Sequence, residues 1–243
     1  MLDTAARLAL SPLLIAQALR IRRIAQSLPE PPGPRAGRSG SGSVLRLAIV
    51  GDSSAAGVGA TSQAEALSGQ LTTALASHFD VDWHLDAQTG ATTRSTIARL
   101  EHAAQRPCDV VLVVLGVNDV TRLVPGSTWV RQQAQLLDRL TALHQPFHFY
   151  LSGMPPIAQF PLLPEPLRWT LGRHANRIEA ARRRWIATRP DCSLLPFDLP
   201  LDPTLAASDG FHPSAKLYAI WAKETASRIL SDWPQFSGKP SAT

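Results

Sequence analysis

The sequence predicts one α/β domain in which a parallel sheet of five strands is covered by helices on both faces, a three-layer α/β/α sandwich. Two observations predict it. From residue 44 onward, short uninterrupted apolar runs alternate with segments of helical periodicity, and the strongest run, VVLVVL at 110–115, is rich in β-branched residues. Continuous apolar strands are typical of parallel sheets buried on both faces. With 243 residues, 44% of them hydrophobic, the chain can bury such a core.

Each element of this domain follows from a local pattern. The apolar runs predict strands over residues 44–50, 81–87, 110–115, 147–152 and 193–198. Apolar residues at helical spacing predict helices over 62–79, 93–104, 129–143, 172–188 and 214–230. Residues 153–171 interrupt the alternation with five prolines among large apolar groups. Because this segment directly follows the fourth strand, we interpret it as a wall of the ligand site rather than as a packed crossover.

Segments at both ends lie outside the domain, which we place at residues 44–232. Residues 1–28 form an amphipathic helical arm, since Leu10, Leu14, Ala18 and Ile21 share one face. Residues 29–43 (PEPPGPRAGRSGSGS) are rich in Pro, Gly and Ser, as is typical of a linker. Residues 233–243 form a C-terminal tail.

The net charge of +5 belongs to the arm and linker. Residues 1–46 hold seven arginines against Asp3 and Glu30, which accounts for the whole excess. A nucleic-acid interface would need basic residues clustered on the domain together with stacking aromatics, and only 6% of the residues are aromatic. We therefore expect no nucleic-acid partner. The run Arg182-Arg183-Arg184 is interpreted as the solvated face of a helix.

Three interpretations of residues 1–28 are open, and none is a membrane span, which needs about 18 apolar residues. As a secretory signal, residues 1–18 would be removed, and the protein would be secreted or periplasmic. As a packed helix, the segment would cover part of the domain. As an interfacial helix, it would lie in a membrane surface while Arg20, Arg22 and Arg23 contact anionic headgroups. We favour the last, which predicts a cytoplasmic or peripherally membrane-associated protein with membrane contact through residues 1–28.

Polar segments follow four of the predicted strands, at the edge where ligands bind to an open parallel sheet. The segments are GDSSAAGVG from residue 51, QTGAT from residue 88, GVND from residue 116 and, after a loop, DGFHP from residue 209. They bring a serine, a glycine, an asparagine and an Asp-His pair to one edge of the sheet. This combination indicates acyl transfer to a serine.

Each of these residues has a role in that chemistry. Ser53 is the candidate nucleophile, and because a serine hydroxyl needs a base to take its proton, His212 is the candidate base. Asp209 lies three residues before His212 and can fix the tautomer of the imidazole. The backbone N–H groups of Ser53 and Gly90 and the side-chain amide of Asn118 can form the oxyanion hole.

At these residues the chain resembles the SGNH subgroup of the GDSL esterases and lipases. The matching signature residues, in the order of the family, are Ser53, Gly90, Asn118 and His212. The likeness covers residues 44–232, with Ser54 where many relatives carry Leu. It implies the SGNH hydrolase fold with flavodoxin-like strand order 2-1-3-4-5. It also implies a serine that acts without the G-x-S-x-G elbow of α/β-hydrolases.

The cysteines and histidines predict neither a disulfide nor a metal site. The implied strand order separates the strands after Cys108 and Cys192 by a third strand, about 10 Å in all, which is beyond disulfide reach. We therefore expect two free thiols, buried or half-buried. His144 and His148 are separated by Pro146 and cannot share a helical face for a metal ion.

Together these features predict a serine hydrolase that cleaves carboxylic esters through an acyl-enzyme, with no metal or organic cofactor. The apolar segment 153–171 predicts a short- to medium-chain acyl group, with Phe160 and Trp169 as candidate substrate-binding residues. The expected partner is a small-molecule or lipid ester. The same triad would serve a lysophospholipase, a thioesterase or a carbohydrate deacetylase. From another class, the alternative is a catalytically idle lipid- or partner-binding module that uses the arm.

Overall fold

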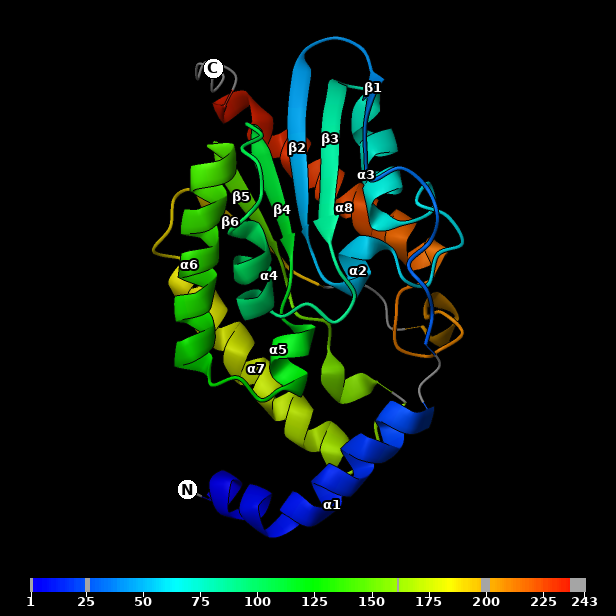
Figure 1. Cartoon of the computed structure of the whole chain (residues 1–243), viewed down its shortest axis with the longest axis vertical. Coiled ribbons are helices and arrows are strands. Elements are labelled where there is room, and N and C mark those ends of the chain that lie inside the picture. The colour runs from blue at the N-terminus through cyan, green and yellow to red at the C-terminus, as the bar shows by residue number, and fades with distance from the viewer. Residues whose placement is uncertain (1, 25–26, 161, 198–201, 237–243) are drawn as a thin grey trace.

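A mixed sheet of six strands runs through the centre of the molecule in the order β1-β3-β2-β4-β5-β6 (Figure 1). The computed structural model describes residues 2–24, 27–160, 162–197 and 202–236. The strands are β1 (Ala36–Gly40), β2 (Val44–Gly51), β3 (Asp80–Ala87), β4 (Val110–Val114), β5 (His148–Ser152) and β6 (Cys192–Leu195). Strands β2 to β6 are parallel to one another, and β1 pairs antiparallel with β3 at the edge.

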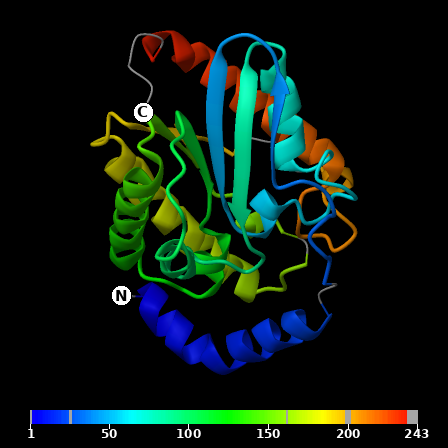
Figure 2. The same cartoon turned by 45° about the horizontal axis from the view of Figure 1, so that its top comes forward.

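Helices cover both faces of this sheet (Figures 1 and 2). They are α1 (Leu2–Ile24), α2 (Ser53–Ala56), α3 (Leu67–Ala76), α4 (Thr93–Leu100), α5 (Val117–Thr121), α6 (Gly126–His144), α7 (Leu167–Ile186) and α8 (Ala215–Asp232), with 3-10 turns η1 (Ile157–Gln159), η2 (Pro203–Leu205) and η3 (Trp233–Gln235). Helices α3 and α8 pack on one face, and α4 and α6 on the other. Strand β4 is apolar throughout because Val110, Leu112 and Val114 contact the first layer while Val111 and Val113 contact the second.

The five parallel strands have the predicted flavodoxin-like order, but the sheet has six strands rather than five. The sixth is β1, which lies inside the segment 29–43 that we predicted as a linker. Its sequence, AGRSG, is exposed at every position, and the guanidinium of Arg38 pairs with Asp80 on β3 at 2.6 Å. An edge strand is held by backbone hydrogen bonds along one side, and none of the side chains of β1 is buried. Its sequence therefore lacks the alternation of apolar and polar residues that would predict a strand.

Some boundaries also differ from the prediction. The helix expected over 62–79 is confined to Leu67–Ala76, and the helix expected over 172–188 begins earlier, at Leu167. Residues 233–235 of the expected tail form η3. The remaining tail residues 237–243, residues 25–26 of the expected arm and Asp198 of the expected fifth strand lie outside the described residues.

Cys108 and Cys192 are both free and buried, as predicted. Cys108 lies two residues before β4, and Cys192 is the first residue of β6. Strand β5 lies between β4 and β6 in the sheet. Burial raises the pKa of each thiol to about 12, so both stay protonated at neutral pH.

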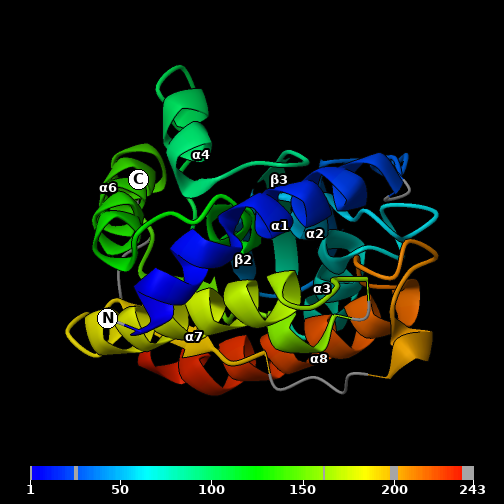
Figure 3. The ribbon, with the colours of Figure 1, turned by 90° about the horizontal axis from the view of Figure 1, so that it is seen from below.

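Helix α1 lies across the end of the molecule at which the parallel strands finish (Figures 1 and 3). Leu14, Ala18 and Ile21 pack against an apolar cluster around α7, here called the α7 cluster. Its buried members are Val120, Trp129, Ile157, Leu163, Leu167, Leu171, Ala175 and Ile178. The domain therefore contacts three of the four residues of the apolar stripe predicted on the arm. Within the described chain, no helix has the length and apolar character needed to cross a membrane.

Candidate active site

A serine, a histidine and an aspartate form a continuous hydrogen-bonded chain at the carboxyl edge of the sheet. The Oγ atom of Ser53 lies 2.9 Å from Nε2 of His212, and Nδ1 of His212 lies 2.5 Å from Oδ2 of Asp209. Ser53 is more than 150 positions from Asp209 and His212 in the sequence, and the fold brings it to them. This arrangement can pass a proton from the serine to the imidazole while the carboxylate faces the other ring nitrogen.

The turn after β2 fixes the position of Ser53. Gly51 ends the strand so close to its neighbours that a Cβ there would lie 2.4 Å from Ala55 and 2.6 Å from the carbonyl oxygen of Val114. Asp52 then caps α2, because its Oδ1 accepts a hydrogen bond from the N–H of Ser54 at 3.0 Å. Ser53 is therefore the first residue of a short helix, held immediately beyond the end of the strand.

Asp209 shapes the opposite side of the site. Its Oδ1 accepts hydrogen bonds from the backbone N–H groups of Phe211 at 2.9 Å and His212 at 3.0 Å, which fold the loop so that the imidazole meets the other carboxylate oxygen. Burial raises the pKa of Asp209, but the hydrogen bonds from His212 and Phe211 outweigh it and leave the pKa below its usual value. The carboxylate is therefore ionised at neutral pH and can stabilise a protonated His212.

The three predicted oxyanion-hole residues border the same edge. Gly90 has a φ of +77°, which favours glycine, and nothing lies within 4 Å of where a Cβ would be. Within the described chain, the backbone N–H groups of Ser53 and Gly90 have no hydrogen-bond acceptor. The amide of Asn118 donates to the carbonyl oxygen of Ala91 at 3.0 Å and to Oδ2 of Asp52 at 3.4 Å. These bonds tie the loop after β4 to the loops after β2 and β3.

Two buried carboxyl groups support these loops. Asp119 is fully buried and accepts hydrogen bonds from the backbone N–H and the hydroxyl of Thr93, the latter at 2.9 Å. Burial raises the pKa of Asp119, and it raises the pKa of Asp52 to about 7. Through these hydrogen bonds, Asp52 holds the turn after β2 and Asp119 holds the start of α4.

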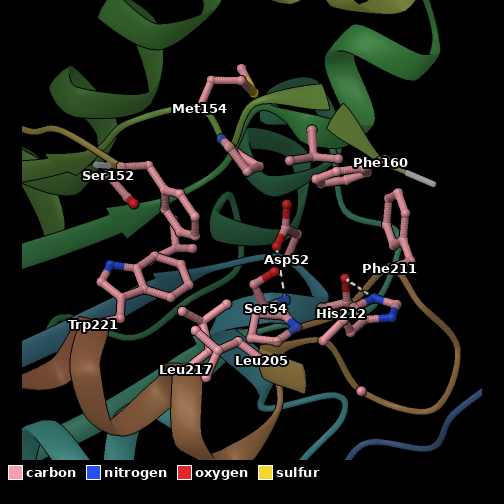
Figure 4. A pocket seen from close by; sticks show the side chains of 18 of the residues that line it. Asp52, Ser54, Ser152, Met154, Phe160, Leu205, Phe211, His212, Leu217 and Trp221 are labelled. Carbon is pink, nitrogen blue, oxygen red and sulfur yellow. Dashed lines mark hydrogen bonds between the residues drawn. The ribbon is translucent and has the colours of Figure 1, made fainter. Parts of the chain in front are cut away.

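A cavity of about 380 Å³ opens beside Ser53 and His212 (Figure 4). Its apolar lining comes from several elements and includes Met154, Phe160, Phe197, Leu205, Phe211, Leu217 and Trp221. The segment 153–171 forms only part of this wall, since its later residues belong to the α7 cluster. Phe197, Leu217 and Trp221 were missed by the sequence reasoning because their apolar character is equally typical of a core.

Of the two predicted substrate-binding residues, the structure places one at the cavity. Phe160 lines it and contacts Phe211 edge-on, with ring centroids 5.1 Å apart. Trp169 is outside the lining, is 40% exposed, and lies under the guanidinium of Arg173 at 5.3 Å. The prediction for Trp169 was wrong because α7 begins at Leu167, so that Trp169 falls on the outward side of the first helical turn.

Arg182 is a second correction, since it is buried rather than solvated. Its side chain is 1% exposed, and its guanidinium donates to the carbonyl oxygens of Ser152 and Leu115, where β5 and β4 end. The same group lies 4.9 Å from the ring centroid of Trp129. Arg182 therefore holds together the two strand ends that lead into the loops bordering the cavity. Its position four residues from Ile178 and Ile186, both buried, was the signal that could have indicated this.

Among the described residues, no group of three or more His, Cys, Asp or Glu side chains is placed to hold a metal ion.

Comparison with known proteins identifies relatives of this chain. The sequence model of the GDSL-like Lipase/Acylhydrolase family matches residues 49–220. The psychrotrophic esterase EstA from Pseudoalteromonas sp. has a similar structure, with a TM-score of 0.58, 20% identity, and coverage of 78% of this chain and 98% of that one. No curated protein matches the sequence.

Two further solved structures share the fold. The family 3 carbohydrate esterase from Clostridium thermocellum has a TM-score of 0.59 and 16% identity, with coverage of 80% of this chain and 100% of that one. The acetylxylan esterase from Geobacillus stearothermophilus has a TM-score of 0.55 and 19% identity, with coverage of 78% and 95%. At these identities, the likeness concerns the fold alone.

The raised pKa of Asp52 predicts a pH-dependent contribution to stability. The folded protein keeps a proton on Asp52 up to a pH of about 7, whereas the unfolded chain loses it near the usual value of 3.8. The folded state therefore binds more protons between these values, and the free energy of unfolding should fall as the pH rises through this window. Asp52→Asn keeps an oxygen for the N–H of Ser54 but cannot titrate.

Urea unfolding of the wild type and of Asp52→Asn, followed at intervals from pH 4 to pH 8, measures this contribution. We expect the stability of the variant relative to the wild type to increase with pH, and to be greatest at pH 8. Two curves that stay parallel across the whole range would show that Asp52 does not titrate with a raised pKa.

Proposed function

The chain belongs to the GDSL-like lipase/acylhydrolase family, and we propose that it is an esterase that hydrolyses carboxylic esters through an acyl-enzyme on Ser53. One observation carries this proposal: the hydrogen-bonded chain from Ser53 through His212 to Asp209, at distances of 2.9 and 2.5 Å, stands beside an apolar cavity. The nucleophile and its base thus border a space that can hold an acyl group, and the carboxylate orients the base from outside that space.

The reaction follows from these positions. His212 takes the proton of Ser53 as Oγ attacks the ester carbonyl carbon, and the ionised Asp209 stabilises the imidazolium that forms. His212 then gives this proton to the leaving alcohol oxygen, and the carbon–oxygen bond of the ester breaks to leave an acyl-serine. A water molecule, deprotonated by His212, attacks the acyl-serine, and the carboxylic acid leaves as Ser53 regains its proton.

The oxyanion of each tetrahedral intermediate is assigned to three donors. The backbone N–H groups of Ser53 and Gly90, which have no acceptor in the described chain, are available to it. The amide of Asn118 is held in position by its hydrogen bonds to Ala91 and Asp52. These bonds support the proposal that it is a preorganised donor, which does not have to move when the oxyanion forms.

The lining of the cavity supports a short- to medium-chain aliphatic acyl group. Phe160 from the segment after β5, Phe197 from the segment after β6 and Trp221 from α8 surround it with apolar surface. Burial of one methylene contributes about 0.8 kcal/mol, so a cavity with this lining favours a chain longer than acetyl. A lysophospholipase or a thioesterase would use the same triad and the same lining, whereas a sugar deacetylase would gain nothing from it.

Removal of either end of the proton relay tests the proposed mechanism. Ser53→Ala and His212→Ala should each abolish hydrolysis of p-nitrophenyl butyrate while circular dichroism shows an intact fold. Because the pair acts as a unit, the double variant should be no slower than either single variant. A double variant much slower than both would mean that the two residues do not share one mechanism.

The substrate range tests the proposed acyl group. The kcat/KM for p-nitrophenyl esters should rise by about fourfold per added methylene from acetate to hexanoate, as 0.8 kcal/mol for each buried methylene predicts. Phe160→Ala should reduce this rise, and the matched control Trp169→Ala should leave it unchanged. A preference for acetate, or for acetylated sugars over all of these esters, would contradict the proposed acyl group without affecting the triad.

A further inference from the structure

Six large apolar side chains are exposed in the described structure, and all but one of them lie at one end of the molecule. They are Leu13, Ile15, Leu19, Val44, Leu123 and Trp169, between 40% and 60% exposed. Three lie on α1, one lies two residues after the end of α5 and one lies in the first turn of α7. These elements meet at the end where the parallel strands finish (Figures 1 and 3). Only Val44, at the start of β2, lies at the opposite end. Single exposed apolar residues are ordinary, but a group on one surface indicates an interaction site.

Packing of α1 on the domain does not use these residues. The inward side of the helix carries Leu14, Ala18 and Ile21, which contact the α7 cluster. Ile15 and Leu19 lie one turn apart on the outward side and are 60% and 49% exposed. Folding therefore covers one apolar face of α1 and leaves a second one in contact with water.

Two hydrogen bonds hold the helix in this orientation. The side-chain amide of Gln17 donates to the carbonyl oxygen of Glu165 at 2.6 Å and accepts from the N–H of Leu167 at 3.1 Å. These bonds fix the rotation of α1 relative to the start of α7. Because Trp169 lies in that first turn of α7, its exposed ring belongs to the same end of the molecule as the outward face of α1.

The charges on this face indicate what kind of partner binds to it. Arg20 and Arg23 are exposed beside Leu19, and the sequence contains no acidic residue between Asp3 and Glu30. The guanidinium of Arg173 lies over the ring of Trp169. Apolar side chains interleaved with arginines match a surface of anionic lipid, which takes the apolar groups into its acyl boundary and pairs the guanidinium groups with phosphates. A second copy of this chain, docked by the same face, would instead bring like charges together.

This face is connected to the cavity through packed side chains. Met154 and Phe160 both line the cavity and pack against the α7 cluster, against which Leu14 and Ala18 of α1 also pack. A surface bound to the outward face of α1 therefore lies next to the part of the molecule that borders the cavity. From this placement we propose that Leu13, Ile15, Leu19, Arg20, Arg23 and Trp169 bind an anionic lipid surface and hold the cavity close to lipid-borne esters.

The part of this proposal that concerns lipid-borne esters rests on the proposed esterase function, while the binding of lipid does not. Vesicle binding and hydrolysis of a soluble ester are therefore measured separately on the full chain. If the wild type binds vesicles but hydrolyses no ester, the proposed esterase function is wrong and the proposed lipid-binding surface is supported. If it hydrolyses p-nitrophenyl butyrate but does not bind vesicles, the lipid surface fails alone.

The first test removes the exposed apolar groups. The triple variant Leu13→Gln, Ile15→Gln, Leu19→Gln keeps good helix formers on α1, and Val44→Gln is the matched control, since Val44 is 46% exposed at the opposite end. In sedimentation with vesicles of phosphatidylcholine and phosphatidylglycerol, we expect the triple variant to bind at least about tenfold more weakly than the wild type. Val44→Gln should bind like the wild type, and both variants should keep the wild-type rate on p-nitrophenyl butyrate.

The second test removes the charges and does not depend on the first. The double variant Arg20→Gln, Arg23→Gln should reduce binding to the anionic vesicles by about tenfold or more at low salt, because two charges that attract the anionic headgroups are lost. Arg184→Gln, an exposed arginine near the other end of α7, is the matched control and should have no effect. If the triple variant and the double variant both bind the vesicles as tightly as the wild type does, the proposal is overturned. A wild-type dimer in size-exclusion chromatography that becomes monomeric in the triple variant would overturn it in favour of self-association.

Discussion

Parallel pairing of β2 with β3 and with β4 is the constraint on which the site depends, because it brings the carboxyl ends of these strands to one edge. The loops that leave this edge carry Ser53, Gly90 and Asn118, and none of the three is close to the others in sequence. Their relative positions are therefore set by the sheet. The Asn118 amide then hydrogen-bonds to the loops after β2 and β3, which limits the movement of the three loops relative to one another.

Buried polar groups hold this edge together at a cost in desolvation. Arg182 donates to the carbonyl oxygens at the ends of β4 and β5, and Asp52 and Asp119 hold the loops between them. Each of these groups is less than 5% exposed, so each would destabilise the fold if its partners were lost. The hydroxyl of Ser53 lies at the end of this rigid frame, beside the cavity. A fixed frame of this kind is what the proposed preorganised oxyanion hole requires.

The sequence predicts those parts of the fold and of the site that depend on the residues of a single segment. Strand β4 is apolar at every position because both of its faces are buried, and the four polar motifs follow strands in a fixed order. Prediction failed where the outcome depends on a distant partner. Strand β1 exists because β3 offers an edge, Arg182 is buried because two strand ends offer carbonyls, and Trp169 turns outward because α7 starts at Leu167. The sequence of the arm left packing on the domain as one of three interpretations, because the surface that its apolar stripe contacts, the α7 cluster, is formed by distant residues.

The proposed mechanism requires Ser53 to be the nucleophile that carries the acyl group. Labelling of the native protein with a fluorophosphonate, followed by peptide mass spectrometry, tests it most directly, because the reagent phosphonylates an activated serine and leaves ordinary hydroxyls unmodified. We expect one adduct, on the peptide that contains Ser53, formed at the rate at which ester hydrolysis is lost and absent in His212→Ala. An enzyme that hydrolyses esters while Ser53 remains unlabelled, or that loses activity with the adduct on another serine, would contradict the account.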